Sequence, residues 1–284
     1  MKTIIAFATA IIFAACTPAK KEPSPEEKHP EAKELAVPTI PAGITDPQER
    51  ASYLLLHFWD SLDFADRSAS LDTALMEQSF ANFAAIMHMA VPSRRAEAVD
   101  TMMSRALRAG QDVYLFTASV ADRYLFDPSS PLFSEELYEP FALFAADDAP
   151  DAFAAKEKLR IIDTNRAGRK LPDFTVSTAD GSRISTRDFA GKPFILFFYE
   201  PGCGNCRQAA FDLMADSAIG NLPVLAIYLG DDDDAWRRHL GEMPAGWTVA
   251  RDTGRVVDSH HILYIRATPS IALISADGTL LRWI

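Results

Sequence analysis

The segment DFAGKPFILFFYEPGCGNCRQ, residues 188–208, decides the fold of the second half of the chain. Its central run at 194–199 is apolar at every position, as is typical of a strand covered on both faces of a sheet. A Pro-Gly turn, two cysteines three positions apart and a helical pattern of apolar residues follow directly. This order predicts a strand that leads through a short turn into a helix whose first turn carries both cysteines.

The place of Cys203 at the start of this helix favours ionisation of its thiol. Unpaired backbone N–H groups and the positive end of the helix dipole stabilise a thiolate there. Cys206 lies three positions on, on nearly the same side of the first turn, and can resolve a mixed disulfide by intramolecular attack. We therefore expect a redox-active disulfide in which Cys203 is the nucleophile and Cys206 the resolving cysteine.

A CxxC motif has other interpretations. Covalent haem attachment needs a histidine directly after the second cysteine, and Arg207 stands there. A structural zinc site needs two more ligands, and no recognisable ligand pair is present. A structural disulfide stays open, although the order strand, turn, CxxC and helix is the context for exchange chemistry. The acidic run at 231–234 is interpreted as a solvated helix N-terminus rather than a calcium loop. No cofactor and no metal site are predicted.

Short runs of β-branched and aromatic residues, separated by turns, fill the remainder of 167–284. We expect strands at 174–177, 183–185 and 224–228 in addition to the run at 194–199. Strands that alternate with helical patterns are typical of an α/β domain. The sequence thus predicts a central sheet flanked by helices.

Residues 168–284 resemble thioredoxin-fold proteins, and among them the TlpA-like thiol-disulfide oxidoreductases. The matching pieces are LPDF at 171–174, the segment at 188–206, the strand at 224–228 and IRATPSIALISADGTLL at 265–281. The resemblance implies a thioredoxin-like fold with a mixed sheet, in which Pro269 is a cis-proline facing the active-site disulfide. It implies that the backbone of Thr268 pairs with the cysteine-bearing strand of a substrate. Protein thiols or disulfides as substrates, an unidentified electron donor, and reduction more often than oxidation are also implied.

Two positions depart from the pattern of that family. The aromatic residue that usually precedes the first cysteine is Gly202 here, which predicts a more exposed Cys203. The buried acid that assists proton transfer to the resolving thiol is replaced by Phe197. Glu200 is nearer to the cysteines and is the candidate proton acceptor, with a merely solvated acid at a strand end as the alternative.

Residues 45–166 repeat apolar side chains at helical spacing and predict an all-helical domain. Asp46 is placed to cap its first helix, and Gly110 to end a later one. Stripes of Met and Phe at this spacing are interpreted as core. The segment ERASYLLLHFWDSLDFAD at 49–66 resembles the helical domain of unknown function that precedes thioredoxin modules in some Gram-negative lipoproteins. That resemblance supplies no catalytic residue.

The N-terminus carries an export signal. Lys2 precedes an apolar run that is too short to cross a bilayer, so residues 1–15 are interpreted as a signal peptide. Ala14-Ala15-Cys16 resembles the lipobox of bacterial lipoproteins, which implies lipidation at Cys16. Residues 16–44, rich in Pro, Lys and Glu, are the expected tether. Thr17 after the lipidated cysteine implies the outer rather than the inner membrane of a Gram-negative envelope, with the protein facing the periplasm.

The charge balance excludes nucleic acid as a partner. Acidic residues number 39 against 28 basic ones, and no basic block occurs. The sequence predicts a lipid-anchored periplasmic thiol-disulfide oxidoreductase. One alternative is an envelope binding lipoprotein whose helical domain binds a partner while the thioredoxin fold is a docking surface. Peroxide reduction is a weaker alternative, because peroxidatic sites need Thr or Ser where Glu200 stands.

Overall fold

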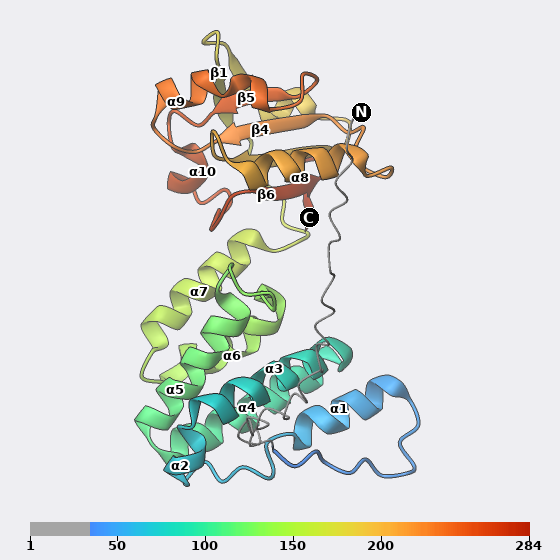
Figure 1. Ribbon diagram of the computed structural model, residues 1–284, viewed down its shortest axis with the longest axis vertical. Coiled ribbons are helices and arrows are strands. Elements are labelled where there is room, and N and C mark those ends of the chain that lie inside the picture. The colour runs from blue at the N-terminus through green and yellow to red at the C-terminus, as the bar shows by residue number, and fades with distance from the viewer. Residues whose placement is uncertain (1–34) are drawn as a thin grey trace, which may run out of the picture. The chain divides into compact units, whose positions relative to one another are not determined.

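The computed structural model describes residues 35–284, in which a run of helices precedes a sheet (Figure 1). The signal peptide predicted at 1–15 and the lipidation predicted at Cys16 lie outside the described residues. The predicted tether is described from residue 35, and as far as residue 44 it forms no helix or strand. Within the described part of the chain, no helix has the length and apolar character needed to cross a membrane.

The helical domain extends from α1 to α7. Its elements are α1 (Pro47–His57), α2 (Arg67–Ser70), α3 (Thr73–Met89), α4 (Pro92–Ala109), α5 (Gln111–Ala121), the π-helical turn η1 (Asp122–Phe126), α6 (Glu135–Asp148) and α7 (Ala152–Asn165). The carboxylate of Asp46 accepts the N–H groups of Gln48 and Glu49 at 2.9 Å, so this residue caps α1 as predicted. Gly110 separates α4 from α5 with φ +149°, a conformation that residues with a Cβ rarely adopt.

The stripes of Met and Phe form the core of the helical domain, as expected from their spacing. The most deeply buried members, each at most 1 % exposed, are Met76, Phe80, Phe83, Met87, Met102 and Met103. Burial of one such side chain contributes about 1.5–3 kcal/mol relative to leaving it exposed.

The sheet domain extends from β1 to β7, and its described strands lie in the order β2-β1-β5-β4-β3-β6-β7. The strands are β1 (Thr175–Thr178), β2 (Arg183–Ser185), β3 (Phe194–Tyr199), β4 (Val224–Tyr228), β5 (Thr248–Arg251), β6 (Ser270–Ile274) and β7 (Leu280–Trp283). The helices are η2 (Thr186–Phe189), α8 (Gly204–Ala215), α9 (Asp233–Arg238), η3 (Leu240–Glu242) and α10 (Val256–Ser259). Strand β3 pairs in parallel with β4 and antiparallel with β6. The prediction of an all-helical domain followed by a mixed sheet with flanking helices is confirmed.

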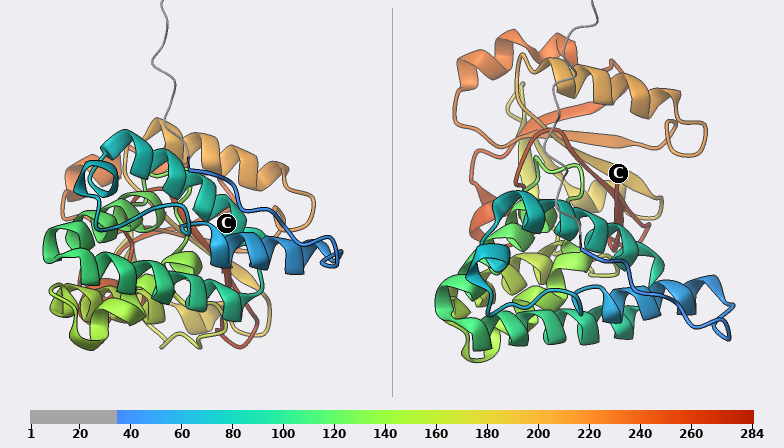
Figure 2. Two further views of the ribbon diagram at one scale, coloured as in Figure 1. Left: turned by 90° about the horizontal axis from the view of Figure 1, so that it is seen from below. Right: turned by 60° about the horizontal axis from the view of Figure 1, so that its bottom comes forward.

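Both faces of β3 are covered, as its unbroken apolar run predicts (Figures 1 and 2). Ile195, Phe197 and Tyr199 pack in one cluster with side chains of α8 and α9. Leu196 and Phe198 pack in a second cluster on the opposite face, together with α10. The strand therefore emerges from the core at Glu200, directly before the two cysteines.

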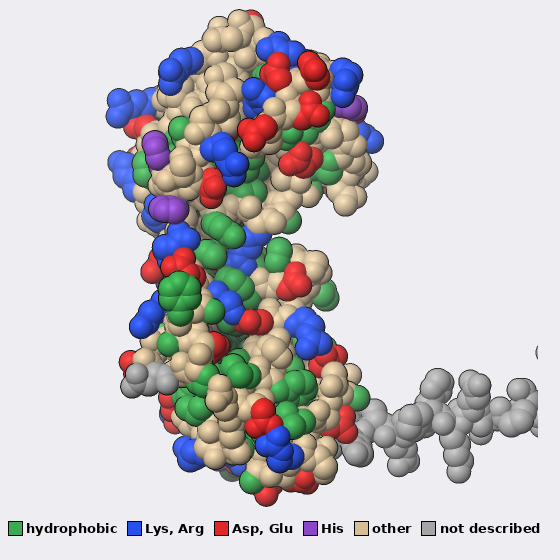
Figure 3. Space-filling model, turned by 90° about the vertical axis from the view of Figure 1, so that its left-hand side faces the viewer, with side chains coloured by type: hydrophobic (Ala, Val, Ile, Leu, Met, Phe, Trp, Pro, Cys, Tyr) green, Lys and Arg blue, Asp and Glu red, His purple; other side chains and the backbone are tan. Residues whose placement is uncertain are grey.

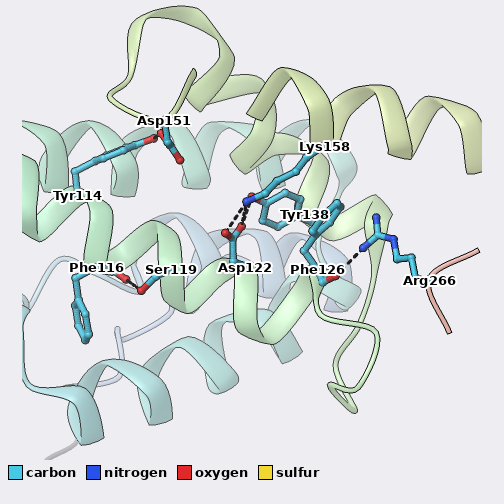
Figure 4. Close-up of polar contacts among 9 residues, drawn as sticks. All are labelled: Tyr114, Phe116, Ser119, Asp122, Phe126, Tyr138, Asp151, Lys158 and Arg266. Atoms are coloured by element: carbon cyan, nitrogen blue, oxygen red, sulfur yellow. Dashed lines mark hydrogen bonds and ion pairs between the residues drawn. The ribbon is translucent and has the colours of Figure 1, made fainter. Parts of the chain in front are cut away.

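The helical and sheet domains belong to one compact unit and contact each other just before the start of β6. Asn165, the last residue of α7, accepts the N–H of Tyr264 at 2.9 Å and donates to its carbonyl at 3.0 Å. Arg266 donates to the carbonyl of Phe126 at 2.6 Å, and its guanidinium lies 3.7 Å from the centre of that ring (Figure 4). The segment that leads to Thr268 is thus held by helices that precede it by about a hundred residues or more.

The surface carries charges of both signs. Lysine and arginine side chains alternate with acidic ones over the face shown in Figure 3, so this face has no continuous basic surface. A continuous basic surface is the electrostatic signature of nucleic-acid binding. The chain as a whole is acidic, with a net charge of −11.

Candidate active site

The turn after β3 places Cys203 at the N-terminus of α8. Gly202 adopts a positive φ of +73°, which turns the chain into the helix. Cys203 then has extended backbone angles and acts as the N-cap, and its Sγ accepts the N–H of Cys206 at 3.1 Å. The first turn of the helix thus directs a backbone donor at this sulfur, which is the arrangement that favours a thiolate.

Cys203 and Cys206 form a disulfide, with their Cα atoms 5.2 Å apart. Cys206 has no exposed surface, whereas Cys203 is partly exposed. An incoming sulfur therefore reaches Cys203 and not Cys206.

Thr268 and Pro269 lie at the same end of the sheet's strands as the cysteines. Phe198 in β3 is paired with Ser270 in β6, and the two strands are antiparallel, so the residue before Ser270 lies beside the end of β3. The Thr268–Pro269 peptide bond is cis. The structure thus brings the cis-proline and the CxxC turn together at the end of strand β3, as the family resemblance implies.

Glu200 and Phe197 differ in burial. Phe197 is fully buried, and its ring centre lies 5.0 Å from that of Trp247, so no acid occupies this position in the core. Glu200 is exposed at the end of β3, and partial desolvation raises the pKa of its carboxyl above the usual range. Its backbone carbonyl accepts the N–H of Cys203 at 3.3 Å. Glu200 therefore lies next to the site with a carboxyl that takes up a proton more readily than an ordinary glutamate.

Sequence reasoning missed two residues of the site, His239 and Glu242. Gly202 predicts a more exposed Cys203, and in the structure Cys203 is partly exposed while the imidazole of His239 lies against Gly202. Glu242 accepts the N–H of Gly202 at 3.0 Å and lies 2.8 Å from Nδ1 of His239. The spacing of a histidine and a glutamate three residues apart, after the predicted helix at the acidic run, was the available signal.

The acidic run caps the helix that precedes His239, as interpreted from the sequence. Asp232 accepts the N–H of Ala235 at 2.8 Å, and Asp233 pairs with Arg237 one turn later at 2.6 Å. Within residues 35–284, no three His, Cys, Asp or Glu side chains come together as a metal site would require.

A buried hydrogen bond joins α9 to β3, the strand that leads to the two cysteines. Trp236 donates its indole N–H to the hydroxyl of Tyr199 at 2.9 Å, and both side chains are at most 2 % exposed. Burial raises the pKa of Tyr199 to about 12, so its hydroxyl stays protonated at all physiological pH values.

Replacing Tyr199 by phenylalanine is expected to lower the free energy of unfolding by about 1–3 kcal/mol, because the indole N–H of Trp236 is left buried without an acceptor. Urea denaturation of the wild type and Y199F measures this loss. The control is Y53F on the partly exposed face of α1, which is expected to change the value by about 0.5 kcal/mol or less. Equal stability of Y199F and wild type would contradict the prediction.

The helical domain contains a cluster of polar side chains that pair with one another (Figure 4). Lys158 donates to Asp122 at 2.6 Å, and the hydroxyl of Tyr138 donates to the same carboxylate. Tyr114 donates to Asp151 at 2.7 Å. Burial raises the pKa of both tyrosines, so their hydroxyls remain donors. These mutual contacts give the cluster a structural role in joining α5, α6 and α7.

Two family profiles divide the chain at the boundary between the helices and the sheet. The first, the domain of unknown function DUF5106, matches residues 15–164, which is just over half of the chain. The chain belongs to the DUF5106 family. The AhpC/TSA family matches residues 167–282. The DUF5106 part thus carries α1 to α7, and the AhpC/TSA domain, which has a thioredoxin-like fold, carries the sheet and both cysteines.

A solved structure resembles both parts together. A thioredoxin-like protein from Bacteroides caccae aligns with a TM-score of 0.78 and 27% sequence identity. The alignment covers 88% of this chain and 93% of that chain. The combination of a DUF5106 part with a thioredoxin-like domain therefore has a counterpart of the same fold.

Curated relatives match the AhpC/TSA domain. Thiol-disulfide oxidoreductase ResA of Bacillus cereus is 24% identical over 136 residues, which are 46% of this chain and 73% of that protein. Chloroplastic peroxiredoxin Q of Triticum aestivum is 28% identical over 134 residues, covering 46% of this chain and 61% of that protein. The domain is homologous to thiol-disulfide oxidoreductases of the ResA type, and these homologues support a redox function in general.

Proposed function

We propose that the chain is a lipid-anchored thiol-disulfide oxidoreductase of the periplasm that reduces disulfides through Cys203 and Cys206. One observation carries the proposal: the partly exposed Cys203 caps α8 and its Sγ accepts the N–H of Cys206, while Cys206 itself is buried. This asymmetry matches the division between an attacking and a resolving cysteine. The disulfide between the two cysteines supports the same assignment.

The reaction begins with the pair in its dithiol form. The thiolate of Cys203 attacks one sulfur of a substrate disulfide, a mixed disulfide forms, and the other substrate sulfur leaves as a thiolate. Cys206 gives up its proton and attacks the sulfur of Cys203, which releases the second substrate thiolate and forms the Cys203–Cys206 disulfide. Two electrons pass from the pair to the substrate. A dithiol donor of the envelope, reacting in the reverse sense, restores the dithiol form.

Neighbouring groups assist these two steps. The backbone of Thr268 pairs with the extended segment around the cysteine of the substrate, because Thr268 lies beside the CxxC turn, just before the first paired residue of β6. Glu200 accepts the proton of Cys206 as that thiol attacks. Its raised pKa supports this role, since a carboxylate with an ordinary pKa is a weaker base.

The cellular location rests on the first residues of the chain. Cleavage after residue 15 and acylation of Cys16 place the protein on a membrane surface, because more than one acyl chain gives stable anchoring. The tether at 16–44 lets the folded part reach substrates in the periplasm. We place the anchor in the outer membrane of a Gram-negative envelope.

The direct test uses the full chain, reduced with dithiothreitol and freed of the reductant. Mixed with oxidised insulin, each protein molecule is expected to lose two thiols while one insulin disulfide is reduced. Persistence of the Cys203 and Cys206 thiols would overturn the proposal. Consumption of a hydroperoxide in place of insulin disulfides would also overturn it and would favour the peroxidase chemistry named in the peroxiredoxin Q relatives.

A further inference from the structure

A histidine that the proposed reaction does not use lies against the active-site turn. His239 follows α9, and its ring carbon Cε1 lies 3.4 Å from the point where a Cβ of Gly202 would be. Gly202 directly precedes Cys203, and consecutive Cα atoms are about 3.8 Å apart. The imidazole therefore packs against the residue that directly precedes the nucleophile. Of the side-chain surface of His239, 37% remains exposed to water.

Glu242 holds this ring and the turn together. Its Oε1 lies 2.8 Å from Nδ1 of His239, and its Oε2 accepts the N–H of Gly202 at 3.0 Å. Arg207, in the first turn of α8, lies 3.3 Å from the same Oε1. These contacts, with the hydrogen bond to His239 as the largest cause, lower the pKa of Glu242 below its usual range. Glu242 is thus a carboxylate at neutral pH that bridges η3, the turn and α8.

On the basis of the proposed function, we propose that His239 is a positioning residue that makes the reactivity of Cys203 depend on pH. Imidazole is the side chain that ordinarily titrates between pH 5 and 8. A protonated ring adds one positive charge beside the turn that carries Cys203, and a positive charge favours the thiolate over the thiol. The ring therefore raises the fraction of thiolate in acid, where an isolated thiol is protonated and unreactive.

The charged side chains in contact with the ring keep their charge over the pH range in which imidazole titrates. Among the described residues, Glu242 from η3 and Arg207 from α8 are the charged side chains in contact with the ring or with its partner. A guanidinium keeps its charge throughout the range in which imidazole titrates, and the pKa of Glu242 lies below that range. The other titratable groups at the turn are the two cysteines, whose reactivity is measured, and the carboxyl of Glu200. Glu200 is present in the wild type and in both variants, so the ratio of their rates isolates the contribution of His239.

The test is the rate at which iodoacetamide alkylates Cys203 in the reduced full chain between pH 5 and 9, followed by mass spectrometry. H239F keeps a ring against Gly202 but carries no charge, and H239N keeps a polar partner for Glu242 but does not titrate. We expect the wild type to react about threefold faster than both variants at pH 5.5 and at the same rate at pH 8.5. The control H88F, on the exposed surface of α3, is expected to follow the wild type.

A ratio of rates that stays constant across this pH range would overturn the proposal and leave His239 with a packing role. The alkylation assay contains no substrate, so its outcome is independent of the insulin assay. Failure of the dithiol to reduce insulin would remove the proposed function, whereas a flat rate ratio in a protein that reduces insulin would remove only the role of His239.

Discussion

Replacing Cys203 by serine is expected to abolish disulfide reduction, with a loss of about a thousandfold or more, as removal of a nucleophile causes in other enzymes. The hydroxyl of serine is not ionised by a helix N-terminus at neutral pH, so the attack on the substrate disulfide does not take place. Cys206 cannot substitute for Cys203, because its side chain has no exposed surface. The measurement is the rate of insulin reduction with dithiothreitol as the electron source.

The matched variant is Cys206→Ser, which leaves the attacking sulfur in place. We expect it to form a stable mixed disulfide with the substrate, visible as an adduct on a non-reducing gel, while C203S forms none. An adduct on Cys206 in the C203S variant would show that the roles of the two cysteines are reversed. A C203S variant that keeps full biological activity would favour a binding role for the helical domain.

Replacing Arg266 by alanine is expected to lower the free energy of unfolding by about 3–5 kcal/mol. Arg266 and Glu135 form an ion pair at 2.7 Å in which the side chains are 10% and 16% exposed. Without the guanidinium, the carboxylate of Glu135 loses its ion-pair partner in the contact between the domains. The stacking of Arg266 on the ring of Phe126 is lost as well.

The loss in R266A is expected to depend on pH. Burial raises the pKa of Glu135 even in the wild type, where Arg266 opposes the shift. An acid whose pKa is raised by folding stabilises the native state below its unfolded pKa, and this contribution disappears as the pH rises through the folded pKa. R266A removes the opposing charge, so its deficit relative to the wild type is expected to be smaller near pH 4 than at pH 7.5.

Urea denaturation at these two pH values measures the effect. The control is R187A, which removes an ion pair with Asp173 whose side chains are 77% and 45% exposed, and a loss of about 1 kcal/mol or less is expected there. The double variant R266M/E135Q, which removes both charges, is expected to recover part of the stability. Equal losses in R266A and R187A would contradict the importance of this buried pair.

Local patterns predicted the parts of the fold that depend on neighbours in sequence. The apolar run at 194–199 became a fully buried strand, and strands β2 and β4 begin and end at the predicted residues. Cys203 and Cys206 could be found because a helix N-terminus and a spacing of three are both local features. Asp46 and Gly110 are capping signals of the same kind.

Contacts between distant residues left no such signal. Arg266 meets Phe126 across 140 positions, and Asn165 meets Tyr264 across 99, so no window of sequence contains both partners. His239 is 37 residues beyond Gly202, and the two come together where α9 packs on β3, with Trp236 bonded to Tyr199. The helical domain could therefore be predicted as a bundle. Its hydrogen bonds to the segment before Thr268 could not be predicted.

The central claim is that Cys203 and Cys206 cycle between dithiol and disulfide as a reductant. The most direct test is the midpoint potential of this pair in the full chain, read by thiol trapping across a series of glutathione and dithiothreitol buffers. The account predicts a reversible two-electron transition near the potential of thioredoxin, about −270 mV. A midpoint near about −120 mV would mark a disulfide donor and contradict the direction of electron flow. A pair that never cycles would contradict the oxidoreductase itself.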